Sequence, residues 1–348
     1  MNFSATLTAW YSVNKRDMPW RNTKNPYYIW LSEIILQQTQ YKQGLPYYEA
    51  FINTFPTIFD LANANEQDVL KLWQGLGYYS RARNLHYTAK YIAFELNGEF
   101  PKTYKKLLEL KGVGDYTASA IASICFNEPK AVVDGNVYRV LSRYFNIDTP
   151  INSTKGIKEF KALATELIDV NAPSTYNQAI MEFGAIQCKP KNPDCITCPL
   201  NSSCFALQKN KINLLPVKLK TTKVSNKFMN FMVVISNDKQ ILFEKRTQKG
   251  IWQNLYQFPL IETDTSLSIN TFKSHPKITE FIKTNTIDYR LYNEEDIIHK
   301  LSHQHLYTKF WIIETDQLPT KGIPIKDLKK YPTSILISNF IDRFNFPV

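Results

Sequence analysis

The sequence predicts a protein of two domains, the first all-helical and the second mixed α+β. Up to about residue 206, apolar residues recur at helical spacing, as in residues 28–40 and 155–170. Residues 207–227 are rich in lysine and contain Pro216, which is typical of a linker. After residue 228, strand-like runs alternate with helical segments. We therefore place the two domains at residues 1–206 and 228–348.

The expected elements follow the same patterns along the chain. In the first domain we expect a helix ending near residues 17–21, followed by helices over residues 28–40, 46–55, 62–73, 81–96, 155–170 and 176–187. In the second domain we expect strands over residues 228–236, 241–245, 288–292 and 307–314, with helices near 267–285 and 332–344.

Charge and hydropathy limit the classes of protein to consider. The chain has 348 residues, of which 42 are basic and 31 acidic, giving a net charge of +11. This balance favours a polyanionic partner. A hydrophobic content of 44% argues against a disordered chain. The N-terminus lacks the pattern of a signal peptide, and no apolar stretch approaches the ~18 residues needed to span a membrane. We therefore expect an intracellular protein with no membrane partner.

A glycine-rich turn and a later aspartate stand out in the segment Leu110–Asp134. Gly112 and Gly114 flank Val113 before an alanine-rich helical run. Glycines leave backbone N–H groups uncovered at a helix N-terminus, where they bind anions such as phosphate, although such pairs also occur in ordinary turns. Asp134 follows an apolar run and precedes an amphipathic segment, so it is expected to cap the next helix. An ionised carboxylate there can also stabilise a cationic sugar.

Four cysteines, in the pattern C-x6-C-x2-C-x5-C, form the most specific motif in the chain. Disulfides fit poorly because the chain has no secretory signal. Structural zinc and a four-iron cluster both take four thiolates, so the donor set leaves both open. The fifth cysteine, Cys125, lies in an apolar helix and is expected to pack rather than react. The motif consists of Cys188, Cys195, Cys198 and Cys204.

The segments LKGVGDYTASAIAS and VVDGNVYRVLSR resemble the helix-hairpin-helix, Gly/Pro-Asp superfamily of DNA glycosylases, and within it the adenine glycosylase (MutY) family. The resemblance is strong to about Ala206 and weaker beyond it. The cysteine spacing is identical to that of the endonuclease III and MutY group, where it holds a [4Fe-4S] cluster. The resemblance therefore implies an all-α helix-hairpin-helix body with a four-cysteine iron–sulfur module as its cofactor site.

The resemblance also implies catalytic roles for four residues. LSEIILQQTQ is similar to the catalytic helix of the family, with Glu33 as the general acid; from the sequence alone, Glu33 also fits the polar edge of an amphipathic helix. Asp134 matches the carboxylate that stabilises the sugar, with Asn136 and Tyr116 orienting it. Lyase relatives carry lysine where this chain has Tyr116, and a phenol cannot form a Schiff base. We therefore expect base removal without efficient strand cleavage.

The same comparison implies the DNA contacts. In the family, a wedge fills the gap left by the extruded nucleotide, and an aromatic residue lies beside the lesion base. The adenine pocket is expected to contain Trp20, Arg21 and Gln178, with glutamine where some relatives carry glutamate. The DNA-binding residues are expected to be Leu36, Gln37 and Gln38 as the wedge, Tyr78 beside the lesion base, Arg81 and Arg83 at phosphates, and Gly112, Val113 and Gly114 in the hairpin.

The second domain resembles a Nudix fold that has lost its catalytic motif. Residues 249–259 are similar to the start of such a domain, but the glutamate-rich metal box of a Nudix hydrolase does not follow. Leu301, Ser302 and His303 lie where the family commonly shows Phe-Ser-His, a loop that contacts 8-oxoguanine. We expect this domain to bind rather than cleave, and we expect no metal at the nearby histidines.

Together these features predict a monomeric, cytoplasmic adenine DNA glycosylase that acts on duplex DNA carrying adenine opposite 8-oxoguanine or guanine. Two alternatives stay open at this point. Gln178 in place of glutamate favours a related glycosylase that removes thymine or another mismatched base. A scaffold that binds damaged DNA without catalysis is opposed by the presence of both Glu33 and Asp134.

Overall fold

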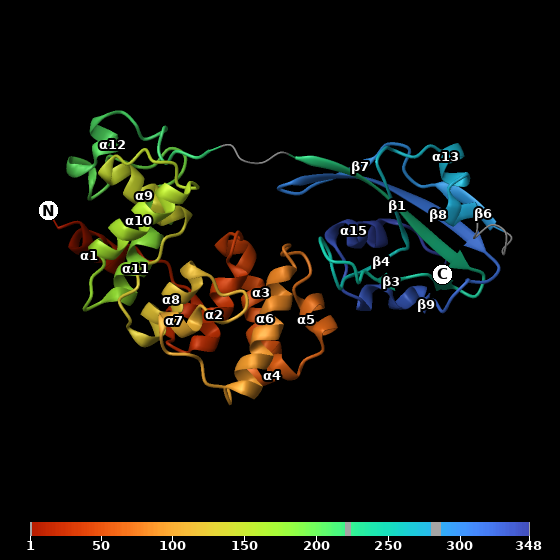
Figure 1. The fold of residues 1–348 in the computed structure, drawn as a ribbon, viewed down its shortest axis with the longest axis horizontal. Coiled ribbons are helices and arrows are strands. Elements are labelled where there is room, and N and C mark those ends of the chain that lie inside the picture. The colour runs from red at the N-terminus through yellow and green to blue at the C-terminus, as the bar shows by residue number, and fades with distance from the viewer. Residues whose placement is uncertain (1, 220–223, 280–286, 348) are drawn as a thin grey trace. The chain divides into compact units, whose positions relative to one another are not determined.

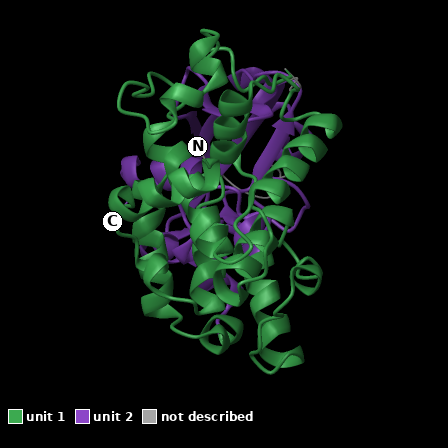
Figure 2. Ribbon diagram, turned by 90° about the vertical axis from the view of Figure 1, so that its left-hand side faces the viewer, with its two compact units in different colours: residues 1–63, 84–220 green, residues 64–83, 221–348 purple. Residues whose placement is uncertain are grey.

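The computed structural model describes residues 2–219, 224–279 and 287–347. Contacts divide the chain into two compact units, coloured separately in Figure 2. Unit 1 contains residues 1–63 and 84–220, and unit 2 contains residues 64–83 and 221–348. The predicted division into an all-helical part and an α+β part is confirmed. The predicted ends of the domains stay predictions.

Unit 1 is built from short helices, and no strand occurs among its described residues. Its core is apolar, with Trp30, Phe51 and Phe160 fully buried. The helices that surround the candidate site are α1 (Phe3–Asn14), α2 (Pro26–Ile35), α8 (Asp115–Phe126), α9 (Gly135–Phe145), α10 (Thr154–Leu167) and α11 (Pro173–Glu182), labelled in Figure 1. The others are η1 (Pro19–Asn22), α3 (Tyr41–Thr54), α4 (Ile58–Asn63), the π-helix η2 (Tyr91–Glu95), α7 (Tyr104–Leu107), the π-helix η3 (Phe183–Gln187), η4 (Asn201–Ser203) and α12 (Phe205–Gln208).

The glycine turn between α7 and α8 forms a helical hairpin. Gly112 has φ +82°, and a Cβ atom there would lie 2.8 Å from the Cβ of Asn84, so both backbone and space require glycine. Gly114 caps α8 without a side-chain hydrogen bond, and a Cβ atom there would meet open space. The first N–H groups of α8 therefore have no side chain of the N-cap residue over them.

Three expected helices differ from the structure. The helix expected to end near residues 17–21 ends at Asn14, and η1 follows as a separate 3-10 helix. The helix predicted over residues 28–40 ends at Ile35, and Gln38 adopts the left-handed conformation with φ +56°. The helix predicted over residues 62–73 is two helices, α4 and α5 (Glu66–Leu72). Asn65 stands at the N-cap of α5 in an extended conformation. Its side chain caps no backbone N–H group and instead donates to the carboxylate of Asp68, in the first turn of α5, at 3.4 Å.

Unit 2 contains a seven-stranded sheet with the order β6-β8-β1-β2-β9, to which β5 and β7 are added beside β1 and β8. The central strands β1 (Ser225–Ser236) and β8 (Gln304–Thr315) run parallel along their whole length, and their neighbours are antiparallel. The other strands of this sheet are β2 (Gln240–Ile241), β5 (Leu260–Thr263), β6 (Ile287–Leu291), β7 (Ile297–Lys300) and β9 (Ile323–Pro324). A separate two-stranded sheet pairs β3 (Glu244–Lys245) with β4 (Tyr256–Gln257), so the strand expected over residues 241–245 is divided between the two sheets.

Helices cover both faces of this sheet. Phe310 and Trp311 are neighbours on β8, so their side chains point to opposite faces. Phe310 stacks on Phe340 of α15 (Ile335–Arg343) with ring centres 4.0 Å apart, and Trp311 stacks on Phe272 of α13 (Ile269–Lys273) at 3.9 Å. The 3-10 helix η5 (Ile325–Lys330) precedes α15. Part of the helix predicted over residues 267–285 lies outside the described residues.

A segment from the N-terminal half of the chain belongs to unit 2. Residues 64–83 contain α5 and the start of α6 (Ser80–Lys90). The Oη of Tyr79 donates to the carbonyl of Thr333 at 3.0 Å, and the amide of Asn254 donates to Glu66 at 2.7 Å. These bonds join residues more than 180 positions apart in the chain. Sequence patterns do not reveal contacts of this kind.

Candidate active site and cysteine module

Glu33 is the central acidic group of unit 1. It lies half-buried on α2, whose other face packs Trp30 and Ile34 into the core. Burial raises the pKa of Glu33 to about 7; a hydrogen bond from Tyr116 acts in the opposite direction, and the charge of Asp134 raises the pKa further. A carboxyl group with this pKa is in part protonated at neutral pH, as a general acid requires.

The side chains of Tyr116 and Asp134 both lie near Glu33, although Tyr116 is at the start of α8 and Asp134 lies beyond its end. Tyr116 is in the first turn of α8, and burial together with the charges of Glu33 and Asp134 raises the pKa of its phenol well above 10. The phenol therefore stays protonated and can donate a hydrogen bond. The structure brings Glu33, Tyr116 and Asp134 together, although their positions in the chain are far apart.

Asp134 is the N-cap of α9, as its place in the sequence indicates. Its Oδ1 accepts hydrogen bonds from the backbone N–H groups of Asn136 at 2.9 Å and Val137 at 2.8 Å, and its Oδ2 accepts from the amide of Asn136 at 2.8 Å. Burial is the largest effect and raises the pKa of Asp134 above its ordinary value, while these hydrogen bonds and Arg139 oppose the rise. Capping therefore supports the ionised form that the chemistry needs.

Arg139 links this carboxylate to the cysteine module, a role that sequence reasoning missed. Its guanidinium donates to Oδ1 of Asn136 at 2.8 Å, to the carbonyl of Gly184 at 2.6 Å and to the carbonyl of Cys188 at 2.7 Å. A Cβ atom on Gly184 would lie 2.6 Å from Asn136, so only glycine permits this approach. The sequence offered one indication of this role, because Arg139 lies one turn into the helix that Asp134 caps.

Two of the three residues expected in the adenine pocket, Arg21 and Gln178, belong to a network around the buried carboxylate of Glu182. Arg21 donates to Glu182 at 2.7 Å and lies over the ring of Tyr11, and the Oη of Tyr11 donates to Oε1 of Gln178 at 3.1 Å. Arg16 also donates to Glu182 at 2.7 Å. These contacts connect Arg21 to Gln178. Trp20 instead packs its buried ring edge-on against Tyr48, with ring centres 4.9 Å apart.

Glu182 should make the stability of the protein depend on acid pH. Burial alone would raise its pKa, but hydrogen bonds from Arg16 and Arg21 outweigh burial and hold the pKa at about 2. Because the folded pKa lies below that of an unfolded glutamate, the stabilisation is present at neutral pH and is lost as pH falls from ~4.5 toward 2. We expect Glu182→Gln to weaken the pH dependence of the free energy of unfolding, measured by chemical denaturation between pH 2 and 5. If the free energy of unfolding depended on pH as in the wild type, Glu182 would not be its source.

The three residues assigned to the DNA wedge lie in the turn after α2. Gln37 donates from Nε2 to the hydroxyl of Thr117 on α8 at 3.2 Å. Gln38 is exposed with its positive φ, and the side chain of Leu36 lies close to Gly44. The turn therefore presents Gln38 outward while Gln37 ties it to the hairpin helix.

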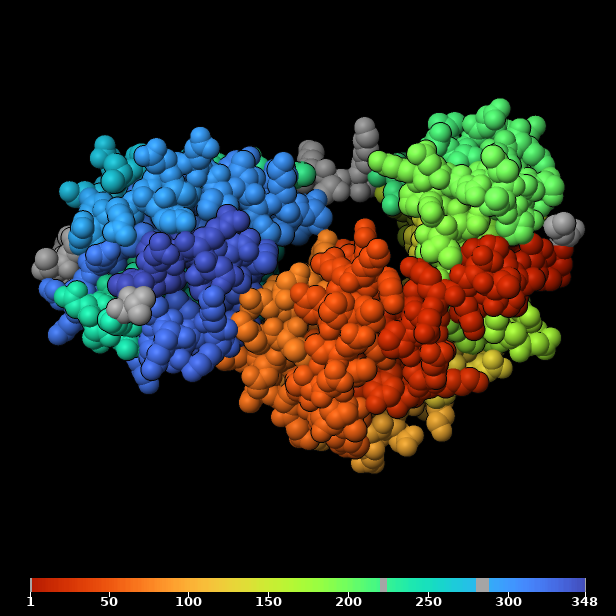
Figure 3. Space-filling view, turned by 180° about the vertical axis from the view of Figure 1, so that it is seen from behind, coloured from red at the N-terminus to blue at the C-terminus, as the bar shows by residue number. Residues whose placement is uncertain are grey.

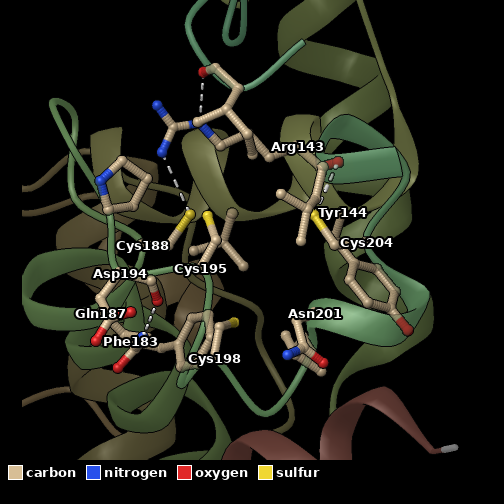
Figure 4. A pocket seen from close by; sticks show the side chains of 15 residues that line it. Arg143, Tyr144, Phe183, Gln187, Cys188, Asp194, Cys195, Cys198, Asn201 and Cys204 are labelled. Atoms are coloured by element: carbon tan, nitrogen blue, oxygen red, sulfur yellow. Dashed lines mark hydrogen bonds between the residues drawn. The ribbon is translucent and has the colours of Figure 1, made fainter. Parts of the chain in front are cut away.

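The four cysteines of the motif line one small cavity of about 30 Å³ in unit 1 and are free thiols (Figure 4). Arg143 of α9 lies beside them with its guanidinium 3.5 Å from Sγ of Cys188, and it also donates to the carbonyls of Lys189 and Pro190. The green segment that carries these cysteines forms a rounded lobe on the surface of unit 1 (Figure 3). Among the described residues, no group of three or more His, Cys, Asp or Glu side chains is arranged to hold a single metal ion.

Residues assigned to the lesion base line one cavity inside unit 2. This cavity of about 550 Å³ is lined by Tyr78 from the turn before α6, by Arg83 from the first turn of α6, and by Leu301, Ser302 and His303. Trp252 and His299 also line it, with ring centres 5.9 Å apart. Sequence reasoning did not assign these two rings to the site. Burial lowers the pKa of His299, so its imidazole is neutral at neutral pH.

Both arginines assigned to DNA phosphates make contacts within unit 2. The guanidinium of Arg81 lies over the ring of Trp73, and burial lowers its pKa to about 10. Arg83 donates to the carbonyl of Gln253 at 2.8 Å. Tyr78, by contrast, is half exposed and has φ +47°. The DNA contacts of all three residues stay predictions.

The helices in the described part of the chain are too short or too polar to cross a membrane.

The region that contains the helical hairpin matches a superfamily of base-excision proteins. Residues 31–165 match the model of the HhH-GPD superfamily base excision DNA repair proteins, and residues 230–343 match the NUDIX domain. A solved thermostable thymine-DNA glycosylase is similar, with a TM-score of 0.55 and 30% identity over 60% of this chain and 95% of its own. A solved endonuclease III–DNA complex, 21% identical with a TM-score of 0.52 over 60% of this chain and 94% of its own, shares the fold.

Relatives along most of the chain identify the family more narrowly. The adenine DNA glycosylase of Buchnera aphidicola subsp. Baizongia pistaciae is 36% identical over 89% of this chain and 86% of its own length. The human adenine DNA glycosylase is 44% identical over 60% of this chain and 40% of its own length. The chain belongs to the adenine DNA glycosylase family.

Proposed function

We propose that this chain removes adenine from duplex DNA in which adenine is mispaired with 8-oxoguanine or guanine, and that it acts as a monomer. The observation that carries the proposal is the group of Glu33, Tyr116 and Asp134, in which burial raises the pKa of one carboxyl to about 7 and the other carboxyl accepts hydrogen bonds that favour its ionised form. Membership of the adenine DNA glycosylase family supports the choice of base.

In this mechanism Glu33 donates its proton to N7 of adenine, because adenine leaves poorly as an anion. As the glycosidic bond breaks, the sugar gains positive charge, which the carboxylate of Asp134 stabilises electrostatically or by forming a covalent intermediate. Asn136 orients Asp134 through its amide and its backbone N–H. Water then adds its hydroxyl group to C1′ of the sugar, and the proton that the water releases returns to the carboxylate of Glu33.

Strand cleavage is not expected to accompany base removal. A lyase needs an amine that attacks C1′ of the sugar, and the residue that faces Glu33 is the phenol of Tyr116. We propose that the product is an abasic site in an intact strand, which breaks only after treatment with alkali.

We propose that unit 2 recognises the base opposite adenine. Its cavity combines the Trp252 and Tyr78 rings with the polar side chains of Ser302 and His303, a mixture suited to a flat, polar base. Residues 260–270, where a Nudix hydrolase needs a glutamate-rich metal box, contain only Glu262 and Asp264 as acids. Binding without hydrolysis is therefore the proposed role of this unit.

We further propose that the cysteine module holds a [4Fe-4S] cluster. Four free thiols around one cavity, with Arg143 beside Cys188, suit a cluster that carries negative charge. When bound, the cluster would supply structural support to the module rather than chemistry on the base. The purified protein should contain ~4 iron atoms per chain and absorb visible light. One zinc per chain without iron would reverse this assignment in favour of a zinc site.

The experiment that tests the function is single-turnover excision from four duplexes. They carry adenine opposite 8-oxoguanine, adenine opposite guanine, thymine opposite guanine, and no mismatch. We expect alkali-labile sites at adenine, formed fastest opposite 8-oxoguanine. The similarity to a solved thymine-DNA glycosylase makes thymine excision the second candidate, and product only from the thymine duplex would establish it. Tight binding without product from any duplex would overturn catalysis altogether.

A further inference from the structure

The segment that delivers Asp134 to the active site is irregular. Residues 127–134 connect α8 to α9 without helix or strand, so the hydrogen-bonding ladder of regular structure does not hold them. Ala131 and Val132 are nonetheless 1% exposed. Buried backbone N–H and C=O groups need partners, and here side chains from other helices supply them.

Asn177 on α11 provides the first set of partners. Its side chain is completely buried, and its Oδ1 accepts a hydrogen bond from the N–H of Val132 at 3.1 Å. Its Nδ2 donates to the carbonyl of Lys130 at 2.8 Å and to the hydroxyl of Ser123 at 2.9 Å. The amide of Asn177 thus holds the N–H of Val132 and the carbonyl of Lys130, and its bond to Ser123 connects both to α8.

Lys161 on α10 binds the carbonyl of Ala131, the residue between Lys130 and Val132. Its Nζ donates to the carbonyl of Ala131 at 2.7 Å, three residues before Asp134. The same ammonium donates to Ser119 of α8 at 3.1 Å and to the carboxylate of Asp115 at 2.9 Å. Asp115 is the first residue of the hairpin helix. A single cation therefore connects the start of that helix with the segment that ends in Asp134.

We propose that Lys161 and Asn177 are positioning residues that fix the carboxylate of Asp134 relative to Tyr116 and Glu33. The inference rests on the proposed function for its effect on catalysis, and on the structure alone for its effect on the segment. Neither residue is assigned contact with the substrate. Misplacement of a reacting group by ~1 Å costs up to ~100-fold in rate, so loss of either set of hydrogen bonds should slow excision.

The test compares Lys161→Met and Asn177→Ala with Lys158→Met, a change at an exposed lysine on the same helix. For Lys161→Met and Asn177→Ala we expect a single-turnover excision constant at saturating enzyme that is lower by at least ~10-fold, with DNA affinity changed by less than ~3-fold. Lys161→Arg should recover most of the rate, because a guanidinium also offers several donors. A rate for Lys161→Met equal to that of the control would overturn the proposal.

Asp115→Asn tests whether Lys161 acts by holding the carbonyl of Ala131 or only by neutralising the charge of Asp115. If Lys161 acted only by neutralising Asp115, the double variant Asp115→Asn, Lys161→Met would excise at the wild-type rate, which would overturn the role of the Ala131 contact. We expect the double variant to stay slow, since that carbonyl is still without its donor. Asp115→Asn alone should leave the rate close to that of the wild type.

Hydrogen exchange of the backbone amides tests the segment without any catalysis. In Lys161→Met and Asn177→Ala, amides of residues 130–137 should exchange faster than in wild type or Lys158→Met, while the core of α8 stays protected. Unchanged exchange in this segment would overturn the proposal even if excision slowed. A wild-type protein that removes no base would overturn the proposed function, and the exchange result would still decide whether these residues hold the segment.

Discussion

Replacing Glu33 by glutamine should reduce adenine excision by at least ~100-fold, because general acid catalysis contributes about 10²–10⁴ in rate and an amide has no proton to give. Glutamine has nearly the same size and can still accept the hydrogen bond from Tyr116, so the fold should persist. The measurement is single-turnover excision of adenine opposite 8-oxoguanine, with affinity for the same duplex measured alongside.

The pH dependence gives this prediction a second, independent readout. Since burial raises the pKa of Glu33 to about 7, its acid form predominates below pH 7 and disappears as pH rises through that value. We expect the wild-type rate to be level at mildly acid pH and then to fall ~10-fold per pH unit above 7, as for a single essential acid. Any residual activity of Glu33→Gln should lack this step.

Glu49→Gln is the matched control, since Glu49 is exposed on α3 and lies outside the candidate site. It should excise adenine at the wild-type rate. If Glu33→Gln and Glu49→Gln behaved alike, the general acid would have to be sought elsewhere. A wild-type rate that does not change between pH 6 and 9 would likewise contradict the assignment.

Sequence reasoning anticipated the acidic residues of the site better than the contacts that hold them. The role proposed for Glu33 came from resemblance, because its apolar neighbours fit an exposed helix edge as well. Burial in the fold raises its pKa, and that is a tertiary effect. Local patterns did reveal that Asp134 caps α9. The contact between Lys161 and Ala131 joins residues 30 positions apart, and no periodicity records it.

Contacts between distant segments accompany the differences between the predicted and observed structure. The predicted helix over residues 28–40 continues the apolar spacing, but the chain leaves the helix at Leu36 and turns at Gln38. The side chain of Gln37 then bonds to Thr117 on another helix, a partner that only the fold supplies. The assignment of residues 64–83 to unit 2 has the same origin, since its partners lie in the C-terminal half of the chain.

Replacing Asp134 by asparagine should abolish excision and leave the fold intact. Asparagine caps helices about as well as aspartate, so its side-chain oxygen can keep the hydrogen bonds from the N–H groups of Asn136 and Val137. The negative charge, however, is lost, and with it the electrostatic stabilisation of the sugar cation. We expect a fall of at least ~100-fold in the single-turnover rate, comparable with the loss of one oriented group in other electrostatic sites.

Asp134→Ala distinguishes the two roles of this carboxylate. Alanine loses both charge and cap, so it should lose the same activity and also destabilise the protein by about 1 kcal/mol in chemical denaturation. Asp148→Asn, a change at an exposed aspartate beyond the end of α9, should affect neither property. Near-normal excision by Asp134→Asn would mean that the cap, and not the charge, is what the active site requires. Because the hydrogen bonds to Asp134 serve the helix and the ionised carboxylate at once, only the comparison of the two variants separates them.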